Sequence, residues 1–144
     1  YSAIYFLDNV DVGGIILKKE FQEQGLKFLM GLLNSKILRW YFPFVSAPFR
    51  GGWLSANKQF LSQLPIRTID FSNSEDKDRH DQMVQHVERM LGLNKKLATA
   101  KTGHDKTVLQ RQINATDNQI DRLVYELYEL TDAEIAIVEE SVGK

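Results

Sequence analysis

The second half of the sequence carries a heptad repeat of apolar residues that is broken once, and this pattern restricts the fold more than any other feature. Before the break, Met83, Met90 and Leu97 recur every seven residues. After the segment KTGHD, the same spacing returns at Ile113 and Ile120. Heptad spacing places one apolar stripe on each of two helices, and a short Gly-containing turn between them favours antiparallel packing. The sequence therefore predicts an antiparallel helical hairpin.

Polar residues in this half predict where the helices begin and how they are aligned. Ser72 and Thr131 are each followed by a Glu three positions later, which is typical of a capping box. We expect the first to open the hairpin and the second to open a short final helix. Asn94 and Thr116 occupy positions on the apolar stripes, where a polar side chain can fix the register of two helices.

The first half reads differently, because short β-branched and aromatic segments replace the long periodic ones. AIYFLD, VGGIIL and IRTID predict three strands. Residues 23–42 have apolar side chains on every face at helical spacing, which predicts a buried helix that stops at Pro43. A loop rich in Pro and Gly follows, and then a short helix with Ser55 as its cap.

These segments together predict an α+β fold. We expect a small mixed α/β lobe with few strands over residues 1–70, followed over residues 71–144 by the long antiparallel helical hairpin and a short C-terminal helix. The chain opens at Tyr1 in the middle of a pattern, so we expect it to be a piece of a longer protein.

The charges are unevenly distributed, although the net charge of the 144 residues is only −1. Residues 18–69 contain eight Lys or Arg and two Glu, which gives this segment a net charge of +6. A solvated surface would account for it, but so would a polyanionic partner.

Composition excludes several classes of function. The chain has no cysteine, so neither a disulfide nor a thiolate metal site is possible, which fits a cytoplasmic protein. No apolar run approaches the roughly 20 residues of a membrane helix, so we expect no membrane partner. His80, His86 and His104 lack metal-ligand spacing and are interpreted as surface residues. No pair of carboxylates indicates acid–base chemistry, so we expect no catalytic residue, cofactor or metal in this segment.

The stretch RWYFPFVSAPFRGGW, at residues 39–53, combines aromatic rings, arginines and a Gly pair. Its rings could close the core, or the loop could present both rings and cations to a partner. We favour rings that point inward and cations that point outward. Backbone N–H groups at a helix N-terminus bind phosphate, Arg can read guanine, and Asn can read adenine.

Three segments resemble the TaqI-like C-terminal specificity domain, the target-recognition region of adenine-specific DNA methyltransferases and of fused restriction-modification enzymes. They are LMGLLNSKILRWYF, SAPFRGGWLSANKQFLSQLPI and IDRLVYELYELTDAEIAIVEE, and the resemblance extends from about residue 4 to residue 140. LLNSK followed by LPI and a helical pair is also similar to half of a type I restriction specificity subunit.

The resemblance implies a lobe that recognises double-stranded DNA, with a helical spacer behind it. It also implies S-adenosylmethionine in an upstream methyltransferase domain of the same polypeptide, with or without a fused endonuclease. The sequence lacks the Asn/Asp-Pro-Pro-Tyr/Phe tetrapeptide, the Gly-rich cofactor motif and the nuclease Asp…Glu-x-Lys cluster. We therefore expect recognition without catalysis. The residues predicted to contact DNA are Arg50, Lys58, Asn57 and Ser55, with Lys36, Arg39 and Arg67 as phosphate contacts.

The alternative is a helical protein-interaction or dimerisation module without direct DNA contact. Tyr125, Tyr128 and the apolar segment IAIV could leave an apolar strip exposed on the hairpin, through which the chain would self-associate.

Overall fold

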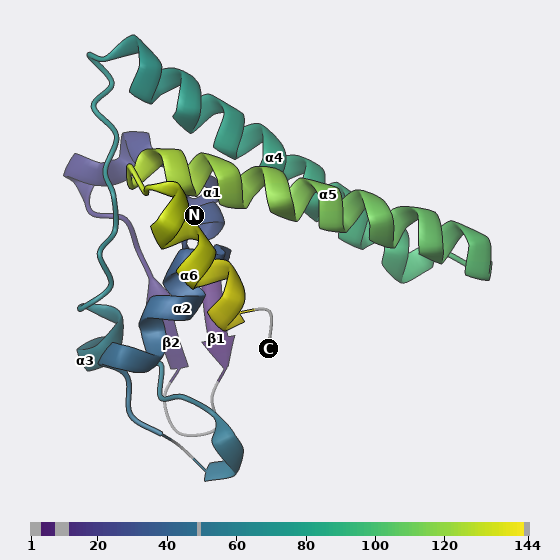
Figure 1. Cartoon of the computed structure of the whole chain (residues 1–144), viewed down its shortest axis with the longest axis horizontal. Coiled ribbons are helices and arrows are strands. Elements are labelled where there is room, and N and C mark those ends of the chain that lie inside the picture. The colour runs from purple at the N-terminus through teal and green to yellow at the C-terminus, as the bar shows by residue number, and fades with distance from the viewer. Residues whose placement is uncertain (1–3, 8–11, 49, 143–144) are drawn as a thin grey trace.

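The computed structural model describes residues 4–7, 12–48 and 50–142. Figure 1 shows a long pair of helices, α4 and α5, with the shorter elements below it. The elements in chain order are β1 (Ile4–Leu7), β2 (Val12–Ile15), the 3₁₀ helix η1 (Lys19–Gln24), α1 (Leu26–Asn34), α2 (Lys36–Val45), the 3₁₀ turn η2 (Arg50–Gly52), α3 (Lys58–Leu61), α4 (Ser74–Thr99), α5 (Gly103–Leu127) and α6 (Asp132–Val142).

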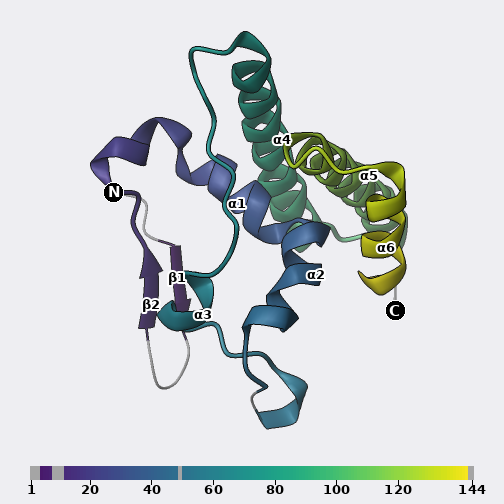
Figure 2. The same cartoon turned by 60° about the vertical axis from the view of Figure 1, so that its left-hand side comes forward.

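The predicted helical hairpin is confirmed. α4 and α5 lie side by side and antiparallel in both views (Figures 1 and 2), joined by a short turn. Val87 of α4 and Leu123 of α5 are buried, as their heptad positions require. Thr116 is also fully buried, and its hydroxyl donates to a carbonyl one turn earlier in α5. Asn94 is exposed and donates to a carbonyl of its own helix, so its predicted place between the helices is wrong.

One of the two predicted capping boxes is confirmed. The backbone N–H of Thr131 donates to the Glu134 carboxylate at 2.8 Å, and the Thr131 hydroxyl accepts from the Glu134 N–H at 3.4 Å. At α4 the cap lies one residue later than predicted. The Asn73 side chain accepts from two backbone N–H groups of the first turn, while Ser72 donates its hydroxyl to Asp70.

The predicted α+β class is wrong, because the described part of the chain is all-α apart from the antiparallel pair β1–β2. Among the residues that the structure describes, strands are limited to β1 and β2, which pair antiparallel from Ile4↔Ile15 to Leu7↔Val12. The buried apolar cluster is built by α1, α2, α4, α5 and α6, together with Ile69. A mixed α/β lobe over the first 70 residues is therefore not formed by the described part of that range.

The predicted third strand, residues 66–70, is irregular chain in which several backbone groups bond side chains. Ile69 is buried there, and its N–H and C=O both bond the side-chain amide of Gln24 at 2.9 Å. The Tyr128 hydroxyl donates to the Pro65 carbonyl at 2.5 Å. Side-chain groups thus take the place of a neighbouring strand for the backbone N–H groups of Arg67, Ile69 and Asp70.

The predicted helix over residues 23–42 is broken in two at Ser35. Ser35 has an extended backbone (φ −70°, ψ 154°), and its buried hydroxyl donates to the Leu32 carbonyl at 2.7 Å. The break turns the chain so that α1 packs on α4 while α2 packs on α6 and α5. Pro43 does not stop the second piece, because α2 continues to Val45. Only Phe44 and Val45 follow it in the helix.

α1 approaches α4 closely at Gly31. A Cβ at this position would lie 2.4 Å from Sδ of Met83, which is fully buried. The glycine therefore sets how near the two helices lie.

One apolar core contains residues from both halves of the sequence, among them Phe28 and Leu38 from the first and Met83 and Val124 from the second. The division into residues 1–70 and 71–144 stays a prediction. No helix in the described ranges is long and apolar enough to cross a membrane.

Candidate nucleic-acid interface

Three cations of the first half, Arg39, Arg50 and Lys58, lie on consecutive elements that carry no carboxylate. Residues 24–69 contain six Lys or Arg and no Asp or Glu. In both views the C-terminal part of α2, the loop over residues 46–55 and α3 lie away from the α4–α5 hairpin (Figures 1 and 2). We refer to residues 39–61, which run from Arg39 of α2 through this loop to the end of α3, as the cationic end. These residues carry three cations and no carboxylate of their own, and a local excess of positive charge attracts polyanions.

The 46–55 loop is closed at its neck by hydrogen bonds. The Ser46 hydroxyl donates to the Ser55 carbonyl at 2.6 Å, and the Ser55 N–H donates to the Ala47 carbonyl at 3.0 Å. Pro48 and Leu54, which lie between the neck and the tip of the loop, form an isolated antiparallel bridge. These contacts hold the end of α2 next to the chain that enters α3, so the loop projects as a closed unit.

Two glycines make the turn at the tip of this loop. Gly51 and Gly52 have φ values of 77° and 82°, in the left-handed region that other residues rarely adopt. The chain reverses here, and Trp53 follows directly after the turn.

Two aromatic rings of this region point to solvent, which corrects the prediction that its rings point inward. The side chain of Trp53 is 75% exposed and that of Phe44 is 70% exposed, whereas Trp40 and Phe42 are partly buried. The Phe44 ring meets the Trp40 ring edge-on, with centroids 5.2 Å apart. Phe49 lies outside the described residues. The position of Trp53 immediately after Gly-Gly was the sequence signal for exposure, because a tight turn places its side chains outside the core.

Some of the predicted DNA contacts lie at the cationic end with exposed side chains. Arg39 of α2 and Lys58 of α3 are exposed. Asn57 is also exposed, but its Oδ1 accepts from the backbone N–H of Gln59 at 3.1 Å and caps α3. The cap predicted at Ser55 is therefore wrong by two residues. Arg50 begins the η2 turn, and its side chain lies outside what the structure describes.

Lys36, by contrast, is held in an internal ion-pair network. Its Nζ lies 2.8 Å from a Glu139 oxygen of α6 and 3.5 Å from Asp121 of α5. Burial alone would lower the pKa of Lys36, but the hydrogen bond to Glu139 and the two negative charges outweigh burial and raise it. This ammonium group joins three helices and is not a free phosphate contact.

Asp121 caps α2 from another helix. The carboxylate is 3% exposed, and its Oδ1 accepts the backbone N–H of Lys36, the first residue of α2, at 2.9 Å. A negative charge at a helix N-terminus is favourable. Burial is the main cause of the raised pKa of Asp121, while the hydrogen bond and the charge of Lys36 act in the opposite direction. Tyr125 completes the network, since its hydroxyl donates to Glu139 at 2.9 Å.

Arg67 is also engaged within the chain. Its Nε donates to the Leu127 carbonyl at 3.2 Å, and a guanidinium nitrogen lies 3.5 Å from Asp76, which is buried. The predicted cations thus divide into Lys36 and Arg67, which stabilise helix contacts, and Arg39 and Lys58, which lie at the cationic end.

One of the three histidines, His80, has a structural role. His80 is buried with Phe28 and Phe71, at ring centroid distances of 5.2 and 5.1 Å, and its Nε2 lies 3.0 Å from the Gln24 carbonyl. Its interpretation as a surface residue is wrong. Within the described ranges, no three His, Cys, Asp or Glu side chains are grouped as metal ligands.

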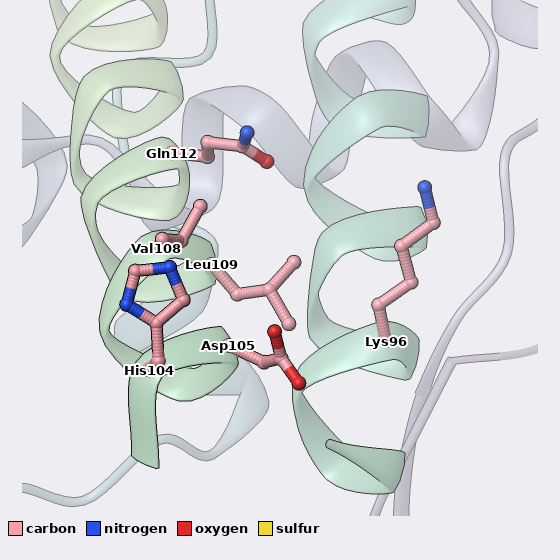
Figure 3. Close-up of a pocket in the computed structure, with 6 residues that line it drawn as sticks. All are labelled: Lys96, His104, Asp105, Val108, Leu109 and Gln112. Atoms are coloured by element: carbon pink, nitrogen blue, oxygen red, sulfur yellow. The ribbon is translucent and has the colours of Figure 1, made fainter. Parts of the chain in front are cut away.

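A shallow pocket of about 320 Å³ lies between α4 and α5 near their connecting turn. Figure 3 shows Leu109 pointing between the two helices, with His104 on the α5 side and Lys96 on the α4 side. These side chains do not converge on a common point, so the pocket has no evident chemistry.

Comparison with known proteins gives a class: the chain is related to a region of a restriction-modification enzyme. The relative is RM.Eco57I of Escherichia coli, described as a type II restriction enzyme and methyltransferase, which is 29% identical over 118 residues. The match covers 78% of this chain but 11% of that enzyme, so the chain spans about a tenth of its relative. No profile of a known protein family and no solved structure matches the chain.

Proposed function

We propose that this chain is a DNA-recognition element of a restriction-modification enzyme, of the kind that the TaqI-like specificity domains represent. The observation that carries the proposal is the cationic end, where a closed loop and two helices carry Arg39, Arg50 and Lys58 and no carboxylate. The relationship to a restriction enzyme and methyltransferase supports the same role.

In this proposal Arg39 and Lys58 contact phosphates, and Arg50, on the η2 turn, contacts a phosphate or a base. Asn57 and Ser55 lie beside them in the chain and contribute backbone or side-chain contacts to DNA. Lys36 and Arg67 add positive potential, but their ion pairs keep them in place.

Catalysis belongs to a methyltransferase domain of the same polypeptide in this proposal, and S-adenosylmethionine is bound there. The chain supplies target recognition to that domain in the cytoplasm. Adenine methylation within a duplex requires the base to be flipped out of the stack, so a separate surface that grips the DNA has a clear use.

The test is fluorescence anisotropy with labelled duplex DNA at several salt concentrations. Each phosphate contact contributes about −0.9 to the slope of log K against log salt. Arg39→Ala and Lys58→Ala should each weaken binding and flatten the slope by about 0.9. Lys101→Ala and Lys106→Ala remove exposed cations near the far turn of the hairpin and serve as controls. Absence of binding at low salt, or equal losses in both pairs, would refute the proposal.

The alternative function, a helical interaction module, is favoured by a different observation. Leu91 and Val108 are 40% and 38% exposed on the α4–α5 hairpin, and Val108 lines the pocket of Figure 3. Within the strip predicted over Tyr125, Tyr128 and IAIV, Tyr125 is buried and Tyr128 is partly buried, while Ile137 is 55% exposed. Light scattering at several concentrations, with Leu91→Glu and Val108→Glu, tests self-association. A monomer at every concentration would remove this alternative.

A further inference from the structure

Trp53 is the most exposed aromatic side chain in the part of the chain that the structure describes, at 75%. Large apolar rings are usually buried, because their burial is a main source of stability. Here the ring stands at the tip of the 46–55 loop, which projects from the helices in both views (Figures 1 and 2).

The loop holds this ring in a defined place. A Cβ at Gly51 would lie 3.4 Å from Cδ1 and 3.7 Å from Nε1 of Trp53, so the five-membered edge of the indole lies against the glycine. The neck bonds between Ser46, Ala47 and Ser55 close the loop behind it. The indole is therefore held by contacts within the loop.

The charged residues on either side of Trp53 in the sequence indicate the chemistry of its ligand. Arg50 and Lys58 are the charged residues within 46–62, and both are cations. A partner that is polyanionic and also offers flat apolar faces satisfies both features. Nucleobases on a phosphate backbone have this combination, since every base presents a π-face on which an aromatic side chain can stack.

We infer that Trp53 is a stacking site for a nucleobase of the bound DNA. This inference rests on the proposed DNA-recognition function and adds a contact that charge alone does not supply. In a closed duplex the base faces are covered by their neighbours, so the ring stacks on a base at an opened or kinked step. The cations at the same end hold the backbone while the ring occupies that step.

The first experiment measures the emission of Trp53 directly. In a Trp40→Phe background Trp53 is the single tryptophan, because the chain contains two. Addition of duplex DNA should quench and shift its emission. Trp53→Ala should weaken binding roughly 5- to 150-fold, the range for loss of one base–aromatic stack. Trp53→Phe should recover most of the affinity, and Phe21→Ala, an exposed aromatic on η1, is the matched control.

The second experiment tests the opened step. A duplex with a one-nucleotide bulge exposes a base face in advance, so it should bind the wild-type chain more tightly than the fully paired duplex. Trp53→Ala should lose this preference, and Phe21→Ala should keep it. DNA binding with unchanged Trp53 emission, or a bulge preference that survives in Trp53→Ala, would overturn the stacking site and leave the proposed function intact.

Two further outcomes are decisive. If the wild-type chain binds no DNA at low salt, the proposed function fails, and the stacking site fails with it. If Trp53 emission responds to protein concentration but not to DNA, the ring lies in a protein contact and the inference is overturned.

Discussion

Gly31→Ala should destabilise the chain, because α1 and α4 leave no room for a methyl group there. The added Cβ would lie 2.4 Å from Sδ and 3.0 Å from Cγ of Met83, and 3.2 Å from Cγ2 of Val87. Met83 is fully buried, so its side chain cannot move into solvent. Overpacking of this kind costs about 1–3 kcal/mol, while Ala in a helix is favoured over Gly by about 0.5–1 kcal/mol. We expect a net loss of up to about 2.5 kcal/mol in the free energy of unfolding.

Gly92→Ala in α4 is the matched control, since a Cβ there meets no atom within 4 Å. It should gain about 0.5–1 kcal/mol from helix propensity alone. The difference between the two variants, about 1–3 kcal/mol, is then the overpacking itself. Urea denaturation followed by far-UV circular dichroism measures both. In a Met83→Ala background the contacts with Met83 disappear and the 3.2 Å contact with Val87 remains, so Gly31→Ala should become less destabilising than in the wild type. Equal stabilisation by Gly31→Ala and Gly92→Ala in the wild-type background would refute the close approach of α1 and α4.

Two other changes test the polar contacts between helices. Asp121→Ala should lower the free energy of unfolding by about 1–3 kcal/mol, because the Lys36 N–H loses its acceptor. Asp121→Asn keeps an acceptor and does not titrate. Burial raises the pKa of Asp121 above its ordinary 3.8, so the wild type loses stability as pH rises from that value through the raised pKa. The stability of Asp121→Asn relative to wild type should therefore increase with pH over this window, and a constant difference in urea titrations at several pH values would contradict the reasoning. Gln24→Ala should lower the free energy of unfolding by about 1–3 kcal/mol, since both backbone groups of buried Ile69 lose their partner. Gln22→Ala, at an exposed position, is its control. Equal urea midpoints for the two variants would contradict the contact between Gln24 and Ile69.

The helical hairpin was predictable because its information is local. Heptad spacing fixes which face of each helix is apolar, and a capping box such as that at Thr131 lies within four residues. The contacts in which a distant side chain takes the place of a strand partner were not predictable. Residues 66–70 have strand-like composition, but the partner of Ile69 is the amide of Gln24, which lies 45 positions away.

The same reason explains the errors in the first half. Residues 23–42 have the periodicity of one helix, and the break at Ser35 is stabilised by Asp121, whose contact with Lys36 spans 85 positions. The positive charges could be counted from the sequence, but their ion pairs could not. Lys36 and Lys58 look alike in sequence, and only the packing of α6 against α2 distinguishes them.

The closed neck of the 46–55 loop separates the tip of the loop from the helices behind it. Its bonds use one hydroxyl and backbone atoms of Ser46, Ala47 and Ser55, so the residues of the tip take no part in them. Doubling the length of a flexible loop costs only about 0.6 kcal/mol in closure entropy. The tip can therefore change in sequence or in length while the helices behind it keep their arrangement. Exchange of this one short loop is then enough to alter the contacts that it makes.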